Sequence, residues 1–208
     1  MQRWQIGLLK AAVWAACLAP LVWLVLRAFR IAGSFIADPV NEFEHVLGNT
    51  GLTILLITLA ITPARLITGF NWLVRFRRLL GLFSFFYICL HVVAFAWLDL
   101  QFAWNRIAAE IALRPYLTVG FASLLAMIPL AITSTRGMQR RLGRRWTSLH
   151  RLVYPAAILG VWHFWWGGVK ADIREPMIYA AILGALLGYR VWRAWRRRQA
   201  RQAALSTP

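Results

Sequence analysis

Residues 79–98 read LLGLFSFFYICLHVVAFAWL and contain no charged side chain apart from one ionisable histidine. A helix of about 20 residues crosses the roughly 30 Å of hydrocarbon in a bilayer, so this stretch predicts a transmembrane helix. Five further runs of similar length and composition predict five more spans. The six expected helices lie near 8–29, 51–70, 79–98, 116–135, 152–168 and 176–192.

The composition predicts the same class: an all-α membrane protein, a bundle of about six transmembrane helices in one domain over residues 1–208. Hydrophobic residues make up 60% of the chain and the mean hydropathy is +0.58, more than a globular core can hide. The net charge of +17 does not indicate nucleic-acid binding, because the arginines cluster between the apolar runs rather than along one polar face. Two isolated cysteines, Cys17 and Cys89, favour neither disulfides nor a thiolate cluster. No internal repeat is evident.

The charge distribution predicts the orientation of the chain, because loops rich in Lys and Arg stay in the cytoplasm. With the N-terminus inside, 18 of the 24 basic residues fall on the cytoplasmic side. Both termini are then cytoplasmic, and we expect a multi-pass protein of the bacterial inner (plasma) membrane. The opposite side receives all seven acidic residues: Asp38, Glu42, Glu44, Asp99, Glu110, Asp172 and Glu175.

Two histidines are expected at the same depth in the membrane. His91 follows Arg78 by 13 residues, and His163 follows Arg151 by 12. At 1.5 Å per residue both imidazoles lie about 18–20 Å from the inner boundary. Two neutral imidazoles on separate helices at one depth are what a bis-histidine haem requires, and aromatic residues on both helices would pack the macrocycle. Alternatively each histidine hydrogen-bonds a neighbouring helix, or His163 belongs to an interfacial aromatic belt.

The other two histidines are predicted at opposite surfaces. His150 lies about 20 Å inward of His163, at the cytoplasmic end of the fifth span. It could ligate a second, inner haem, but no other histidine is expected at its depth. His45 precedes the second span on the outer side, where it is interpreted as a helix-entry or interfacial residue; a ligand or docking role is the alternative. We predict no catalytic residue in this chain.

Several short motifs add a resemblance that covers nearly the whole chain. They are ADPV at 37–40, RRLLGL at 77–82 with LH at 90–91, RPYLT at 114–118, and the loop from TST at 133–135 to LH at 149–150. These stretches resemble the MsrQ family, the haem-binding membrane subunit of the periplasmic protein-methionine-sulfoxide reductase system. That family belongs to the wider ferric reductase-like transmembrane group.

The resemblance implies an electron-transfer subunit with one or two b haems, whose iron ligands carry over onto His91, His163 and His150. Electrons would come from the quinone pool or a cytoplasmic flavin reductase. They would pass to a periplasmic molybdopterin-containing catalytic subunit, in a heterodimer that repairs oxidised methionines. A bound FMN is also implied. Relatives in the wider group carry a second histidine on the third helix and a large cytoplasmic flavin and nicotinamide domain; this chain has neither, so another molecule must supply its electrons.

Two other functions stay open at this point. The chain could be a self-contained transmembrane ferric or quinone reductase, or a non-redox transporter or membrane anchor with structural histidines. A visible haem spectrum excludes the last of these. By topology, the partner would dock near 30–50, 99–115 and 167–175.

Overall fold

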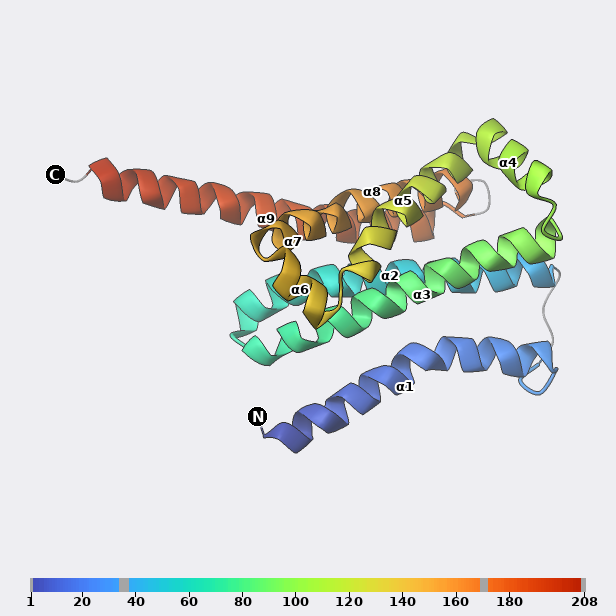
Figure 1. Ribbon diagram of the computed structural model, residues 1–208, viewed down its shortest axis with the longest axis horizontal. Helices are drawn as coiled ribbons and strands as arrows, with labels where there is room; N and C mark the ends of the chain where they lie inside the picture. The colour runs from blue at the N-terminus through green and yellow to red at the C-terminus, as the bar shows by residue number, and fades with distance from the viewer. Residues whose placement is uncertain (1, 34–37, 169–171, 207–208) are drawn as a thin grey trace.

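Every regular element in the computed structural model is a helix, within the residues it describes: 2–33, 38–168 and 172–206. The all-α prediction is therefore confirmed. The long helices form an elongated bundle, in which α5 runs obliquely to α2 and α9 (Figure 1). They are α1 (Arg3–Ala28), α2 (Pro39–Thr68), α3 (Arg77–Ala94), α5 (Pro115–Ile132), α8 (Val153–Gly168) and α9 (Arg174–Ser206).

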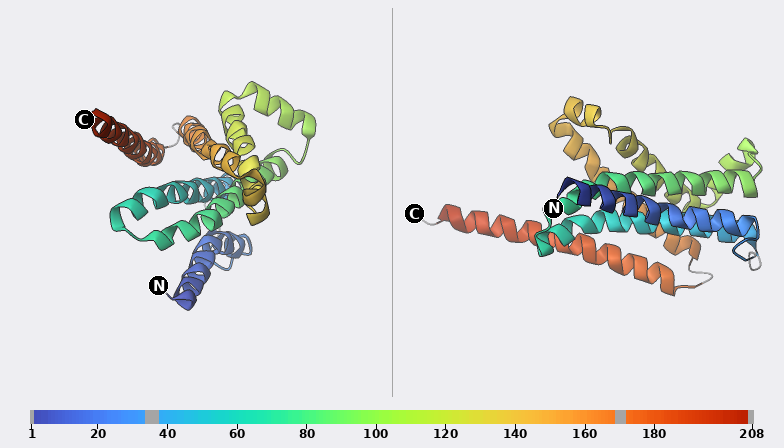
Figure 2. Two further views of the ribbon diagram at one scale, coloured as in Figure 1. Left: turned by 60° about the vertical axis from the view of Figure 1, so that its left-hand side comes forward. Right: turned by 90° about the horizontal axis from the view of Figure 1, so that it is seen from below.

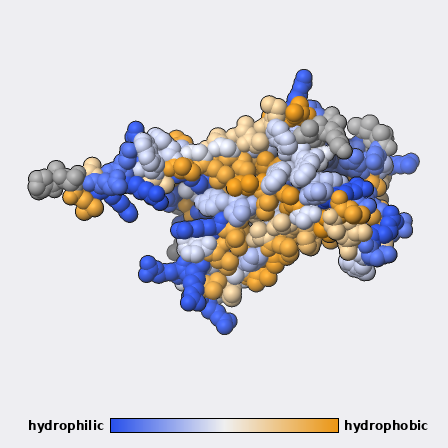
Figure 3. Space-filling view, turned by 90° about the horizontal axis from the view of Figure 1, so that it is seen from above, coloured by the Kyte–Doolittle hydropathy of each residue, from blue (hydrophilic) through white to orange (hydrophobic). Residues whose placement is uncertain are grey.

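Four of the six expected spans are long and apolar enough to cross a membrane: Trp4–Ala28, Pro39–Thr68, Asn71–Asp99 and Pro115–Ile132. The protein is therefore a multi-pass membrane protein. The fifth and sixth predicted spans coincide with α8 and α9, but α8 has only 16 residues and α9 carries arginines in its second half, so their crossing stays a prediction. Hydrophobic residues predominate over the middle of the molecule and hydrophilic residues at its two ends (Figure 3).

Helix α2 begins well before the predicted start at residue 51, and that boundary was wrong. Asp38 caps the helix by accepting hydrogen bonds from the backbone amides of Val40 and Asn41, both 3.2 Å long. Polar residues in the first turns, Glu42 among them, hid this extension from a search for uncharged runs. Glu42 forms an ion pair with the buried Arg27, which joins the C-terminal end of α1 to the N-terminal end of α2.

Short helices occupy both ends of the bundle. A 3-10 helix, Asn71–Phe76, precedes α3, and a π-helical segment, Phe95–Asp99, continues it. Helix α4 (Trp104–Leu113) lies at the end where α3 meets α5 (Figure 1). The opposite end holds three elements before α8: α6 (Arg136–Leu142), α7 (Arg144–Leu149) and a 3-10 turn, His150–Leu152.

Two helix pairs, α2–α3 and α5–α8, repeat one packing contact. Ser84 on α3 donates a 2.8 Å hydrogen bond to the carbonyl oxygen of Gly51 on α2. Ser123 on α5 donates a bond of the same length to the carbonyl oxygen of Ala156 on α8. In both pairs the bonded residues are 33 positions apart, and equivalent residues of the two pairs are 72 positions apart. The equivalent residues of this particular contact differ in type: Gly51 corresponds to Ser123, and Ser84 to Ala156.

Candidate functional site

His91 on α3 and His163 on α8 face each other inside the bundle. Their ring centroids are 6.3 Å apart and their planes cross at 65°. The structure thus brings together the two histidines that the depth comparison paired. Each belongs to a different one of the two repeated helix pairs, and the two histidines are themselves 72 positions apart. The site therefore lies between two equivalent halves.

Both histidines are oriented by a backbone carbonyl of the partner helix. The Nδ1 atom of His91 is 2.9 Å from the carbonyl oxygen of Glu44, and that of His163 is 2.8 Å from the carbonyl oxygen of Tyr116. Each acceptor precedes its histidine by 47 residues. Because a carbonyl only accepts, Nδ1 carries the proton in both rings and donates it. This tautomer leaves the Nε2 lone pair of each ring free to bind a metal.

A glycine lies against each imidazole, one helical turn after the acceptor carbonyl. A Cβ atom on Gly120 would stand 2.7 Å from Nδ1 of His163, and one on Gly48 would stand 3.2 Å from Nδ1 of His91. The first distance is shorter than real contacts allow, so only glycine lets this ring approach its helix backbone. Sequence reasoning missed both glycines. The equal 43-residue spacing of each glycine from its histidine was the available signal.

The separation of the rings suits a single iron ion between two imidazoles. A metal–imidazole bond is about 2 Å long, and Nε2 lies about 1 Å from the ring centre, which together require about 6 Å between the two centroids. The observed value is 6.3 Å. The donor set, two neutral nitrogen ligands inside an apolar bundle, is the kind that holds haem iron. The residues therefore fit a bis-histidine haem.

The ring that lies against His163 is not one of the aromatic residues expected around the macrocycle, which belong to α3 and α8. The ring of Tyr116 stacks on His163 at 6.0 Å and 19°. Phe83, by contrast, packs against Trp14 of α1, while Trp162 and Trp165 are exposed on the outside of α8. Helical periodicity explains this: neighbouring aromatics on one helix point in different directions, so they cannot all face one cavity.

His150 lies apart from this pair, in the 3-10 turn before α8. Its ring stacks on Trp146 at 3.9 Å, and its Nε2 atom is 3.0 Å from the hydroxyl oxygen of Thr133. That hydroxyl donates to the carbonyl of Pro129 at 2.6 Å, so Nε2–H of His150 donates to Thr133. Burial, and secondarily the nearby positive charge of Arg77, lowers the pKa of His150 below its ordinary value, which favours a neutral ring.

The structural repeat also gives the position equivalent to His150. The position 72 residues earlier, on α3, is Arg78. None of the other three histidines has a ring contact with His150 in the part of the chain that the structure describes. Among the described residues, His150 therefore has no second histidine with which to form another bis-histidine site.

His45 is exposed and lies near the start of α2. Its ring is 5.9 Å from that of Phe164, at a tilted angle. Among residues 2–33, 38–168 and 172–206, no three His, Cys, Asp or Glu side chains gather closely enough to hold a metal ion. The acidic residues near His45 thus do not form a metal site with it.

Comparison with known proteins adds a family to this geometry. The family model described as "Ferric reductase like transmembrane component" matches residues 47–161. A protein of Xanthomonas campestris pv. campestris (strain B100), named "Protein-methionine-sulfoxide reductase heme-binding subunit MsrQ", is 52% identical over 94% of this chain and 92% of its own length. A protein of Rhodospirillum rubrum (strain ATCC 11170) with the same name is 52% identical over 93% of this chain and 92% of its own length.

Proposed function

Since the chain belongs to the MsrQ family of protein-methionine-sulfoxide reductase heme-binding subunits, we propose that it binds b-type haem between His91 and His163 and carries electrons across the membrane. The observation that carries the proposal is the pair of imidazoles 6.3 Å apart, each donating through Nδ1 and presenting Nε2. A bound haem supplies reversible one-electron chemistry at its iron. The chain supplies the two ligands and their orientation.

The position of the pair supports delivery of electrons to the outer side. Tyr116 is the second residue of α5, and Glu44 lies in the second turn of α2; both helices start at the predicted periplasmic face. The imidazoles bound to these carbonyls therefore lie near that face. We propose that the acceptor there is a periplasmic, molybdopterin-containing methionine-sulfoxide reductase, with which this chain forms a heterodimer in the bacterial inner membrane.

Electron entry is proposed at the cytoplasmic end, from the quinone pool or a cytoplasmic flavin reductase. Because the His91–His163 pair lies near the outer face, an electron entering from the cytoplasm must cross most of the bilayer. The proposal assigns His150, at the cytoplasmic end of α8, to an inner relay or to one ligand of a second haem. A bound FMN is part of the proposal on the family resemblance alone.

The first test is the visible spectrum of the solubilised protein with and without dithionite. We expect a low-spin b-type spectrum, and its loss in His91→Gly and in His163→Gly because each variant removes one of the two histidines that would hold the iron. His45→Gly, at an exposed position, is the matched control and should keep the spectrum. Added imidazole should restore low-spin haem in the two ligand variants, which separates lost ligation from misfolding.

Two outcomes contradict the proposal. A colourless protein after expression with ample haem excludes the electron-transfer function, and a normal spectrum in either ligand variant refutes the pairing. A second measurement addresses the self-contained reductase: the purified chain without its partner should reduce ferric chelates only slowly. Fast reduction of these chelates would favour that alternative.

A further inference from the structure

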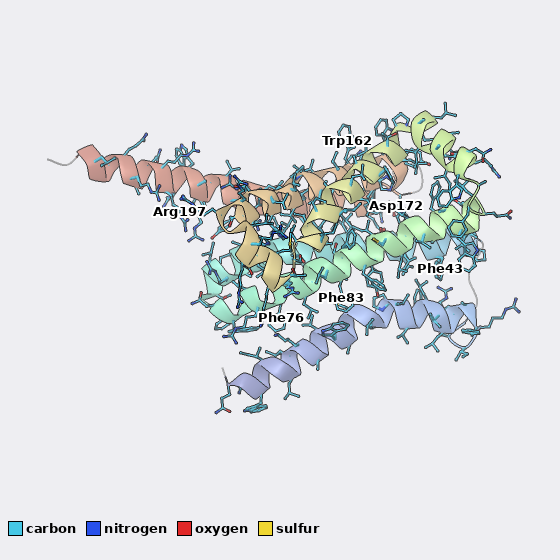
Figure 4. All side chains as sticks on the ribbon, viewed as in Figure 1. Phe43, Phe76, Phe83, Trp162, Asp172 and Arg197 are labelled. Atoms are coloured by element: carbon cyan, nitrogen blue, oxygen red, sulfur yellow. The ribbon has the colours of Figure 1, made fainter. Side chains whose placement is uncertain are left out.

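Helix α9 continues as a single helix beyond the rest of the bundle. Figure 2 shows its C-terminal part extending past every other helix, and Arg197 lies on this part (Figure 4). Asp172, just before the start of α9, lies at the opposite end of the bundle. The N-terminal half of α9 packs against α2, where Tyr179 and Thr53 share a 2.7 Å hydrogen bond. The extension carries most of the charge of the helix, which has six arginines from residue 190 to residue 201.

Four of these arginines form a row on one side of α9. Arg190, Arg193, Arg197 and Arg201 are spaced by three or four residues, so their side chains follow one another along a single face. These four, with Arg198, line a shallow groove. We call this row the arginine face.

The arginine face begins against the bundle and continues along the exposed extension of α9. Arg190, its first member, donates a 2.7 Å hydrogen bond to the carbonyl oxygen of Leu59 on α2. Its guanidinium also lies 5.4 Å from the ring centre of Tyr154 on α8. The exposed Trp192 and Trp195 project from the other side of the helix, and tryptophan is typical of the lipid–water interface. The lipid side of α9 is therefore aromatic.

The positive charge of this face has no acidic neighbour in the later sequence. The chain has no Asp or Glu after Glu175, and every acid lies on the predicted outer side. Nη1 of Arg193 is shielded from solvent and has no hydrogen-bond partner among the described residues. A row of guanidinium groups without acidic residues beside it in the sequence attracts an anionic surface.

We propose that the arginine face of α9 is the docking surface for a soluble, acidic electron-donor protein on the cytoplasmic side. The inference rests on the proposed function, because it identifies where the donor binds. Charge complementarity steers such a donor to the cytoplasmic end of the bundle. Arg190, the start of the face, contacts Tyr154, which lies one turn beyond His150. A donor on this face is thereby held near the proposed electron entry.

The test uses the full-length, haem-loaded protein in phosphatidylcholine nanodiscs, with flavodoxin as a small acidic flavoprotein probe. Binding of oxidised flavodoxin is measured first, independently of electron transfer, and haem reduction by reduced flavodoxin is measured second. The test variant combines Arg193→Glu, Arg197→Glu and Arg201→Glu. The control combines Arg136→Glu, Arg140→Glu and Arg141→Glu, the same charge change on α6. A third variant replaces the three α9 arginines with lysine.

We expect the α9 reversal to weaken flavodoxin binding and slow haem reduction about tenfold or more at low ionic strength. The lysine variant and the α6 control should change either value by less than about threefold, and the effect should vanish at about 1 M salt. Dithionite, a small reductant, should reduce all variants alike. If the α9 reversal loses flavodoxin binding but is still reduced normally by dithionite, its haem is intact and only the docking surface has been changed.

Three results with flavodoxin would overturn the assignment, and so would a fourth with anionic lipid. The first three are no flavodoxin binding by the parent protein, no effect of the α9 reversal, or an equal effect of the α6 reversal, which would mean that only bulk charge matters. If the parent protein binds phosphatidylglycerol more tightly than the α9 reversal does, while flavodoxin binding is equal in both, the face binds lipid phosphate instead. Absence of haem in the parent protein refutes the proposed function, while the binding measurement still decides the docking surface.

Discussion

Replacing Gly120 with alanine should damage the site more than any other single added methyl group. The new Cβ would stand 2.7 Å from Nδ1 of His163, whereas ordinary contacts begin at 3.4 Å, so the ring must retreat by about 0.7 Å. That retreat would stretch the 2.8 Å hydrogen bond to the Tyr116 carbonyl to the limit for such bonds. Overpacking of this kind costs about 1–3 kcal/mol, so the haem dissociation constant should rise roughly 5- to 150-fold.

Two matched variants make the prediction quantitative. Gly48→Ala places its Cβ 3.2 Å from His91 and needs a shift of only about 0.2 Å, so its effect should be smaller. Gly188→Ala on α9 meets nothing within 4 Å and should leave haem binding unchanged. The assay is titration of haem into the apoprotein, followed by Soret absorbance, for all three variants. Parent-like affinity in Gly120→Ala, or a larger loss in Gly188→Ala, would refute the reasoning.

Three further predictions concern stability. Ser84→Ala removes the buried hydrogen bond to Gly51 and should lower the free energy of unfolding by about 1 kcal/mol in a detergent melt; an unchanged melt would contradict that contact. Asp38→Ala should lower the free energy of unfolding by about 0.5–2 kcal/mol and speed hydrogen exchange in the first turn of α2. Asp38→Asn keeps the cap, so equal exchange in the two variants would argue against capping. Thr133→Val leaves Nε2–H of His150 without its acceptor and should lower the free energy of unfolding by about 1 kcal/mol. The spectrum of a haem held by His91 and His163 should not change. A spectral change would place that haem near Thr133 instead.

The sequence was sufficient for the helical class and for placing the rings of His91 and His163 at one level of the bundle. A helix rises 1.5 Å per residue. The length of an apolar run therefore predicts a membrane-crossing helix, and the number of residues between each histidine and its flanking arginine predicts the depth of the ring. The start of α2 was missed because its first turns are polar and are held by the cap at Asp38, which hydropathy does not detect. Pattern thus predicts the apolar middle of a membrane helix better than its ends.

The atoms that orient the histidines could not be predicted from residue types. The acceptors at Glu44 and Tyr116 are backbone carbonyls, which every residue has, so the side chains there carry no signal. Gly48 and Gly120 are meaningful only once their histidines are known to lie against them. Thr133 was not predicted as the partner of His150 for a different reason: the two helices between them, α6 and α7, were not predicted.

The repeated helix pairs bear on how the protein is made. Each pair holds its own histidine, the carbonyl that fixes the tautomer and the glycine that gives the ring room. Because α2 and α3 precede α5 and α8 in the chain, every residue that orients the first imidazole is synthesised before the second pair begins. The site is therefore divided between two halves, each of which contains everything that orients its own ring, and it is complete only when the two halves pack together.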